Sequence, residues 1–233
     1  NRLFRAIGQH LQDTIYLHLV PQLLKHADEI SGKVMTSDPF GQGLLQRIAK
    51  TPTKTRDARL KRIKQVLAQA VPQFSELEFR PNKATGVPHL AACYQHWRPH
   101  GAWQLEDQFS DGTLRLIGFL WALQEGEGLL LLEEPELSLN DSIVRHIPLM
   151  IDRVLRKRSA GPRQVIVSTH SEALLRDVGE DATVLVLEPS ANGTGVRPPS
   201  DAEAAQIASG LSVSEVMLPL TVTPKASQLG LFA

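Results

Sequence analysis

The sequence lacks several features that would assign a protein to a particular class. It contains a single cysteine, Cys93, so no disulfide can form within the chain, which suits a reducing cytoplasm. No run approaches the length of a membrane-spanning helix, and no charged-then-apolar leader opens the sequence, so we expect neither a membrane span nor a signal peptide. The 25 basic residues balance the 25 acidic ones, so any nucleic-acid contact must come from a local patch.

The remaining composition is that of a soluble globular protein. Hydrophobic residues make up 42% of the 233 residues and charged residues 21%, and the length suffices for one large domain or a domain with an insertion. The first residue is Asn1 rather than Met, which we interpret as a sign of a fragment or a processed chain.

The first part of the chain is predicted to be helical. Residues 2–49 show a helical pattern broken by Pro21 and the loop SDPFGQG, and residues 57–70 form a better amphipathic helix. Its apolar face contains Leu60, Ile63, Val66, Leu67 and Ala70.

The opposite face of that helix is basic and contains Arg56, Arg59, Lys61, Arg62 and Lys64. Two interpretations stay open. A solvated polar face is the more common case, and contact with the phosphates of a nucleic acid is the alternative.

Residues 72–109 are predicted to form an antiparallel meander, because three short strand-like segments are joined by Pro- and Gly-bearing turns. After Ser110 apolar strands alternate with helices, which indicates a parallel sheet covered by helices. The expected strands are 129–132, 164–168 and 183–187, and the expected helices are 113–123, 141–156 and 172–177. We therefore expect a helical region (1–71), an antiparallel β segment (72–109), a C-terminal lobe (110–220) and a loosely held tail (221–233).

The stretch LLLLEE places Glu133 and Glu134 at the carboxyl end of a strand that is buried by its composition. In open α/β sheets ligands gather beyond this end of the strands. Paired carboxylates there need a cation or a proton to offset their repulsion, and Mg²⁺ bound to nucleotide phosphates is a suitable cation. Glu133 can then hold the metal while Glu134 orients the attacking water. The alternative is a surface turn with solvated acids.

Two further segments carry residues suited to bind an anion. Ser110, Asp111 and Gly112 precede a helix, where free backbone N–H groups favour an anion, although taken alone an ordinary helix cap is the simpler interpretation. His170 follows a short apolar strand and lies among hydroxyl side chains. An isolated histidine is more often structural, but one at the end of a core strand can hydrogen-bond a phosphate oxygen.

Taken in order, FSDGTLR, LLLLEE, LSLN and STHS resemble the C-terminal half of an ABC-type ATPase head of the RecF/SMC-like AAA family. The resemblance implies a P-loop NTPase fold, with ATP and Mg²⁺ as cofactors, a homodimer that sandwiches ATP between its heads, and DNA as a partner in DNA repair or phage defence. It implies Glu134 as the catalytic base, Glu133 as the metal-binding Walker B residue and His170 as the switch that senses the γ-phosphate. Ser110, Asp111 and Gly112 correspond to the signature, and Asn140 to the dimer seam.

The sequence departs from this family in two places. Glu133 replaces the commoner aspartate of Walker B, and no G-x-x-x-x-G-K-[ST] motif occurs. The segment SGKVMTS at 31–37 is not a P-loop, because Ala27 stands where the first glycine is needed and Val34 where Ser or Thr would bind Mg²⁺. In this family the P-loop lies N-terminal to every motif present here. We therefore expect that the chain cannot hydrolyse ATP alone and contributes to a composite site.

Other functions remain as alternatives. The first is a non-hydrolysing DNA-binding or scaffold module of degenerate ABC-like fold, although a scaffold has no need of Glu134 and His170. The second is a metal hydrolase that uses His96 and His100, which is disfavoured because Pro99 interrupts the helix that this spacing requires. In OLD-type relatives a nuclease domain follows the head, but the segment after Pro189 is too short for one, so a nuclease or effector would be a separate partner.

The last residues contain Gln228, Leu229, Leu231 and Phe232 in the order Q-L-x-L-F. They resemble the pentapeptide with which bacterial repair and replication proteins bind the sliding clamp. A flexible tether that presents Leu and Phe anchors to an apolar pocket is physically suited to this role. Packing of the hydrophobic terminus on its own domain is the alternative.

Overall fold

A computed structural model of the chain describes residues 4–27, 38–95, 102–156, 163–179, 181–191 and 193–221. The chain divides into two compact units. The first contains residues 1–140 and 153–168, and the second contains residues 141–152 and 169–233. Within the described ranges, no helix is both long and apolar enough to cross a membrane.

A parallel three-stranded sheet with the order β1-β5-β6 positions the carboxylates of the first unit. Leu130 pairs with Ile15 of β1 and with Val165 of β6. The predicted α/β fold, with a parallel sheet flanked by helices, is confirmed. The strands are β1 (Ile15–Leu17), β5 (Leu130–Glu133) and β6 (Val165–Ser168).

β1 was not expected, because residues 2–49 were predicted to contain only helices. The structure has three helices and this one strand in the described part of that segment. Three residues are too few to show a period in the sequence, and β1 gains its backbone partners only from β5, far along the chain. The helices are α1 (Arg5–Gln12), α2 (Pro21–Lys25) and α3 (Leu44–Lys50).

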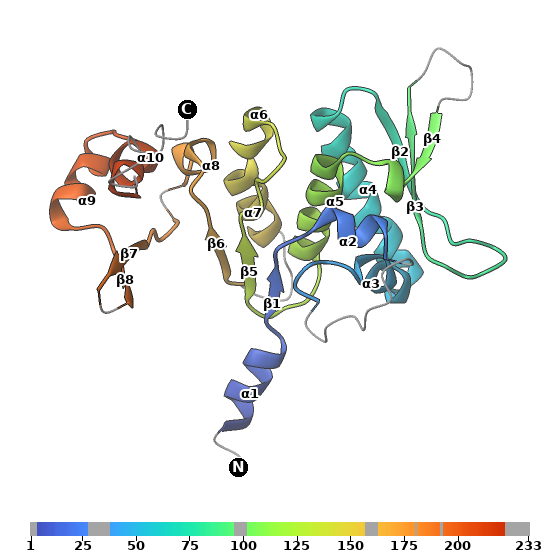
Figure 1. Cartoon of the computed structure of the whole chain (residues 1–233), viewed down its shortest axis with the longest axis horizontal. Coiled ribbons are helices and arrows are strands. Elements are labelled where there is room, and N and C mark those ends of the chain that lie inside the picture. Colours follow the sequence, from blue (N-terminus) through green and yellow to red (C-terminus); the bar gives the residue numbers. More distant parts are fainter. Residues whose placement is uncertain are drawn as a thin grey trace, which may run out of the picture. The chain divides into compact units, whose positions relative to one another are not determined.

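The helix α5 (Asp111–Gln124) is the central helix of the first unit. Ten of its 14 residues are buried, and a helix that is apolar on all sides belongs in a core. It packs against α4 (Thr53–Ala70), which runs beside it in Figure 1. It also approaches the segment after β1, where Gly118 lies close to Leu19. Burial of Trp121 and Leu123 anchors the C-terminal half of α5.

The predicted antiparallel meander is confirmed as a second sheet with the order β2-β3-β4. α4 begins four residues before its predicted start and packs against β2 through Leu60, Ile63 and Leu67, which are buried. The strands are β2 (Phe74–Phe79), β3 (Leu90–Tyr94) and β4 (Ala102–Leu105), followed by the 3₁₀ helix η2 (Glu106–Gln108).

The second unit differs from the sequence expectation in two places. The strand predicted at 183–187 begins only at Val186, as β7 (Val186–Ser190), and it pairs antiparallel with β8 (Gly193–Arg197) in a hairpin instead of joining the parallel sheet. The predicted helix 141–156 is two helices, because Pro148 cannot donate to the carbonyl oxygen of residue 144. The helices of this region are α6 (Asp141–Val144), α7 (Ile147–Arg156), α8 (Glu172–Arg176), α9 (Asp201–Ala208), α10 (Val213–Met217) and the 3₁₀ helix η3 (Leu218–Thr221).

The start of β5 leaves no room for a side chain at Gly128. A Cβ atom added there would lie 2.2 Å from the carbonyl oxygen of Asp13, which is backbone and cannot rotate away. We predict that Gly128→Ala lowers the free energy of unfolding by about 1–3 kcal/mol in chemical denaturation, because it overpacks this contact. Gly179→Ala is the control, because a Cβ there meets nothing within 4 Å. Equal stability of the two variants would contradict the close approach.

Candidate functional site

The parallel sheet brings Glu133 and Glu134 to the edge where the sequence predicted them. Glu133 is the last residue of β5 and lies opposite Ser168, the last residue of β6. The backbone N–H of Glu134 donates to the carbonyl oxygen of Ser168 at 3.0 Å. Both glutamates are half-buried, and Leu130 and Leu132 before them are buried. The carboxylates therefore follow a core strand, and the alternative of a freely solvated surface turn does not describe them.

Glu133 has a partner that the sequence did not suggest. The Tyr16 hydroxyl donates a hydrogen bond to Oε2 of Glu133, across from β1 to the end of β5. This bond raises the pKa of Tyr16, because loss of the phenol proton would set two negative charges against each other. Tyr16 is thus a neutral donor that fixes one oxygen of Glu133 and leaves the carboxylate charge in place. The run IYL in the sequence was the only available signal, and it does not reveal the partner.

The backbone of Glu134 is strained. Its φ angle is +41°, in the left-handed region that residues with a side chain seldom adopt, and Ser138 has a φ of +62°. Each such residue costs about 1–3 kcal/mol, and strain of this kind concentrates at functional sites. The turn that holds Glu134 also contains the hydrogen bond from the Leu137 N–H to the Glu134 carbonyl oxygen. This conformation directs the chain sharply away from the sheet directly after the pair of glutamates.

Ser110 is the N-cap of α5, as the simpler interpretation of the sequence proposed. Its Oγ accepts a hydrogen bond from the Thr113 N–H at 3.1 Å and is 2.8 Å from the Thr113 hydroxyl. Ser110 is nevertheless exposed, so a cap does not prevent contact with a second molecule. Neighbouring Asp111 pairs with Lys25 of α2 at 2.8 Å. The Lys25 hydrogen bond lowers the pKa of Asp111, and a further bond from Gln22 acts in the same direction.

Gly112 is required by packing. A Cβ atom on Gly112 would lie 2.6 Å from the carbonyl oxygen of Ser138, in the turn that follows Glu134. The start of α5 and the turn after β5 are thus in direct backbone contact. The two motifs FSDGTLR and LLLLEEPELSLN, separate in sequence, form one continuous surface.

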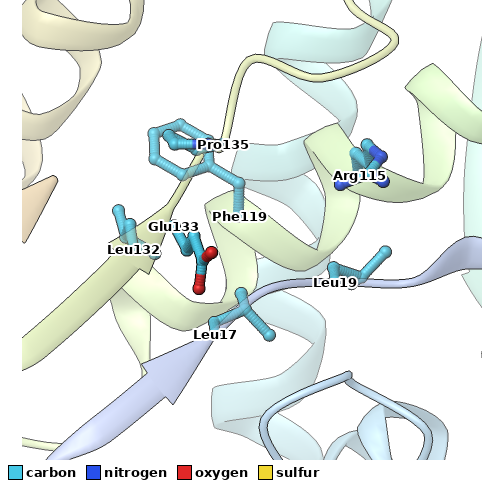
Figure 2. A pocket seen from close by; sticks show the side chains of 7 residues that line it. All are labelled: Leu17, Leu19, Arg115, Phe119, Leu132, Glu133 and Pro135. Atoms are coloured by element: carbon cyan, nitrogen blue, oxygen red, sulfur yellow. The ribbon is translucent and has the colours of Figure 1, made fainter. Parts of the chain in front are cut away.

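Arg115 is a second residue at the site that no sequence pattern indicates. It lies one turn after Asp111 on α5 and lines a small pocket with Glu133, Leu17 and Phe119 (Figure 2). Figure 2 shows the Glu133 carboxylate directed into this pocket. Burial lowers the pKa of Arg115, and the charges of Asp111 and Glu134 act against that shift. The Arg115 Nε is buried and makes no hydrogen bond among the described residues.

The carboxylates fit a metal ion that is also held by phosphates. No group of three or more His, Cys, Asp or Glu side chains in the described residues is arranged to hold a metal ion by itself. Mg²⁺ commonly takes one or two protein carboxylates and completes its shell with water and phosphate oxygens. Glu133 can supply one such ligand, because Tyr16 occupies only its Oε2.

Of the remaining predicted site residues, some lie among the residues that the structure describes and others do not. Asn140 and His170 are both exposed, and His170 belongs to the second unit. The functional roles of these residues and of the glutamates stay predictions. The segment SGKVMTS, the pair His96 and His100, and the clamp-like residues 228–232 lie outside the described residues.

Solved structures with similarity to this chain include heads of SMC proteins, one of them with a TM-score above 0.5. The SmcHead bound to the C-winged helix domain of ScpA is 14% identical, with a TM-score of 0.51 over 83% of this chain and 57% of that chain. A structure from work on ATP-driven dimerization and DNA stimulated activation of SMC ATPases is 16% identical, with a TM-score of 0.48 over 67% and 92% of the two chains. An Smc head domain from Pyrococcus furiosus is 15% identical, with a TM-score of 0.49 over 67% and 38%. At these identities the likeness concerns the fold alone.

A search of curated proteins gives no match. One family model matches residues 12–176, which is more than half of the chain and includes the signature-like, Walker B-like and switch-like segments. The chain therefore belongs to the family described as "AAA domain, putative AbiEii toxin, Type IV TA system".

Proposed function

We propose that this chain supplies the catalytic and dimer-contact residues of an ATP-hydrolysing head of ABC type, whose phosphate-binding loop comes from another segment. The observation that carries the proposal is the pair Glu133 and Glu134 at the carboxyl end of β5, with strain at Glu134. A strained, half-buried acid at this edge of a P-loop NTPase fold suits a base that acts on water. Membership of the AAA family supports nucleotide binding and hydrolysis as the general activity.

Each residue has a chemical task in this proposal. Glu134 accepts a proton from the water that attacks the γ-phosphate, and backbone hydrogen bonds to Ser168 and Leu137 fix the main chain that carries it. Glu133, oriented by Tyr16, contributes a ligand to Mg²⁺, which when bound neutralises charge on the phosphates. Arg115 keeps a positive charge beside both Asp111 and Glu134, which reduces the electrostatic repulsion between the carboxylates.

The proposed site is completed by a second copy of the head. Ser110 is exposed at the start of α5, so this surface can approach the γ-phosphate held by the partner, and Gly112 lets α5 begin directly beside the turn after β5. Asn140 and His170, both exposed, are proposed to act at the dimer seam and as the phosphate sensor. DNA repair and phage defence are the systems that this dimerising switch fits.

The outer edge of β6 supports a composite site. Among the described residues β6 has a neighbour only on its β5 side, and Ile166 is 48% exposed. Parallel sheets are normally buried, so an apolar edge strand of this kind suits pairing with a further strand. A lobe that carries the P-loop would provide one. A non-hydrolysing DNA-binding scaffold is the second candidate, and the lack of a P-loop motif in the 233 residues favours it.

The assignment of Glu134 is tested by Glu134→Gln in the chain supplied with its P-loop lobe. We expect ATP binding to persist and phosphate release to fall at least about 100-fold, because the amide cannot accept the proton of the attacking water. Glu127→Gln is the matched control, since Glu127 is an exposed acid shortly before β5. Unchanged phosphate release in Glu134→Gln would refute the catalytic role.

The signature role of Ser110 is tested by two nearly isosteric variants. Asp and Asn both cap helices well, so each retains the bond that Ser110 makes to the Thr113 N–H. Only Ser110→Asp places a negative charge against the partner's γ-phosphate. We expect ATP-dependent dimerisation, measured by light scattering, to be lost in Ser110→Asp and retained in Ser110→Asn. Dimerisation of both variants to the same extent would show that Ser110 does not face the nucleotide.

A further inference from the structure

The net charge of zero conceals an uneven distribution along the chain. Residues 50–64 contain seven basic side chains and one acidic side chain, whereas the rest of the chain carries 18 basic and 24 acidic residues. This segment comprises the last residue of α3, the linker and most of α4. This segment is strongly basic although the rest of the chain is acidic. It is therefore a local basic patch of the kind that a nucleic-acid contact would require in a chain of zero net charge.

Six of the seven cations belong to α4. Lys64 pairs with Glu76 of β2, and the structure divides the other five into two sets. Arg56 and Arg59 face the protein, where their guanidinium groups lie 4.2 Å and 5.2 Å from the ring centroids of Phe79 and Trp121. Arg56 also pairs with Asp57, the one acid of the segment. The helix therefore uses part of its positive charge for its own packing.

The second set is exposed. Lys54, Lys61 and Arg62, here called the α4 cationic face, lie on the side of α4 away from its buried leucines and isoleucine. Lys54 and Lys61 make no hydrogen bond or ion pair among the described residues, and Arg62 makes only a 3.3 Å contact with Gln124. Exposed Ala58 and Gln65 lie between them, and the one acid on this side of the helix, Asp57, pairs with Arg56 at 3.2 Å. Lys54 and Lys61 are two helical turns apart, about 10 Å along the axis.

The charges of α4 do not match the dipole of the helix. A helix is stabilised by acids in its first turn and bases in its last, by about 0.3–1 kcal/mol each. α4 has no acid in its first turn, where Lys54 lies, and no base in its last turn. Arg59 and Arg62 also add a like-charge pair at i,i+3 spacing. Lys61 has a favourable i,i+4 spacing to Asp57, whereas Lys54 and Arg62 do not stabilise the helix. For these two cations an external anion is a better explanation than a solvated face.

The side chains of the α4 cationic face indicate which kind of anion it binds. It contains no large apolar side chain to enter a membrane and no exposed aromatic ring on which an unpaired base could stack. Lysine and arginine without such neighbours suit contact with regularly spaced phosphates and carry no sequence information. We propose that the α4 cationic face binds the phosphate backbone of duplex DNA. The choice of DNA rests on the proposed function, whereas the surface itself needs neither a P-loop nor Glu134.

The proposal is tested by fluorescence anisotropy with a labelled random-sequence duplex of about 30 bp, without nucleotide, over about 50 to 200 mM salt. The variant carries Lys54→Gln, Lys61→Gln and Arg62→Gln. We expect affinity at the lowest salt to fall roughly tenfold or more, and the slope of log affinity against log salt to flatten by about 2 to 3, because three phosphate contacts are lost. Thermal unfolding should be unchanged or improved, since like charges have been removed.

The matched control carries Arg5→Gln, Lys83→Gln and Arg176→Gln, three exposed cations elsewhere, and so has the same net charge. It should bind duplex DNA nearly as the unaltered chain does. The proposal is overturned if both triple variants lose affinity equally, if the unaltered chain does not bind duplex DNA at low salt, or if single-stranded DNA of equal length binds at least as tightly. Because no nucleotide is present, each of these results leaves the proposed ATPase site to be judged by Glu134→Gln.

Discussion

The parallel pairing of β5 with β1 and β6 is the constraint on which the candidate site depends. It aligns Leu130 with Ile15 and Val165, and it ends where Glu133 lies opposite Ser168. A slip of one residue would turn the buried leucines of β5 outward, so the hydrophobic pattern fixes the register. The positions of the two glutamates therefore follow from the burial of the strand before them. The strain at Glu134 is sustained because this register is held from both sides.

The acidic side chains at the site have partners of different charge. Asp111 is paired with the cation Lys25 and is already neutralised. Glu133 is held by Tyr16, a neutral donor that does not offset a negative charge. Arg115, half-buried on α5, acts on Asp111 and Glu134 together. This distribution explains how several acids coexist beside a core strand. Asp111 is the ion-paired acid, and Glu133 and Glu134 are the acids to which we propose chemical roles.

Local patterns predicted the elements that carry long apolar signals. β5, α5 and the meander were expected from sequence, and so was the emergence of Glu133 and Glu134 at a strand end. β1 was missed because three residues show no period, and its partner lies more than a hundred residues away. The hydrogen bond of Tyr16 and the contact of Gly112 with the Ser138 carbonyl depend on that long-range pairing and packing. The basic face of α4 was visible as composition, but only the structure separated the arginines used in packing from the exposed cations.

A metal site at the end of β5 is tested by replacing Mg²⁺ with Fe²⁺ in the head supplied with its P-loop lobe and mapping oxidative cleavage of the backbone. Glu133 alone supplies too few ligands to hold the metal ion, so the phosphates of ATP must complete its coordination shell. Cleavage is therefore expected beside Glu133 and Glu134 only when ATP is present. Glu133→Ala should abolish it. Cleavage that does not depend on ATP, or that occurs only at other segments, would show that the carboxyl end of β5 is not part of a nucleotide site.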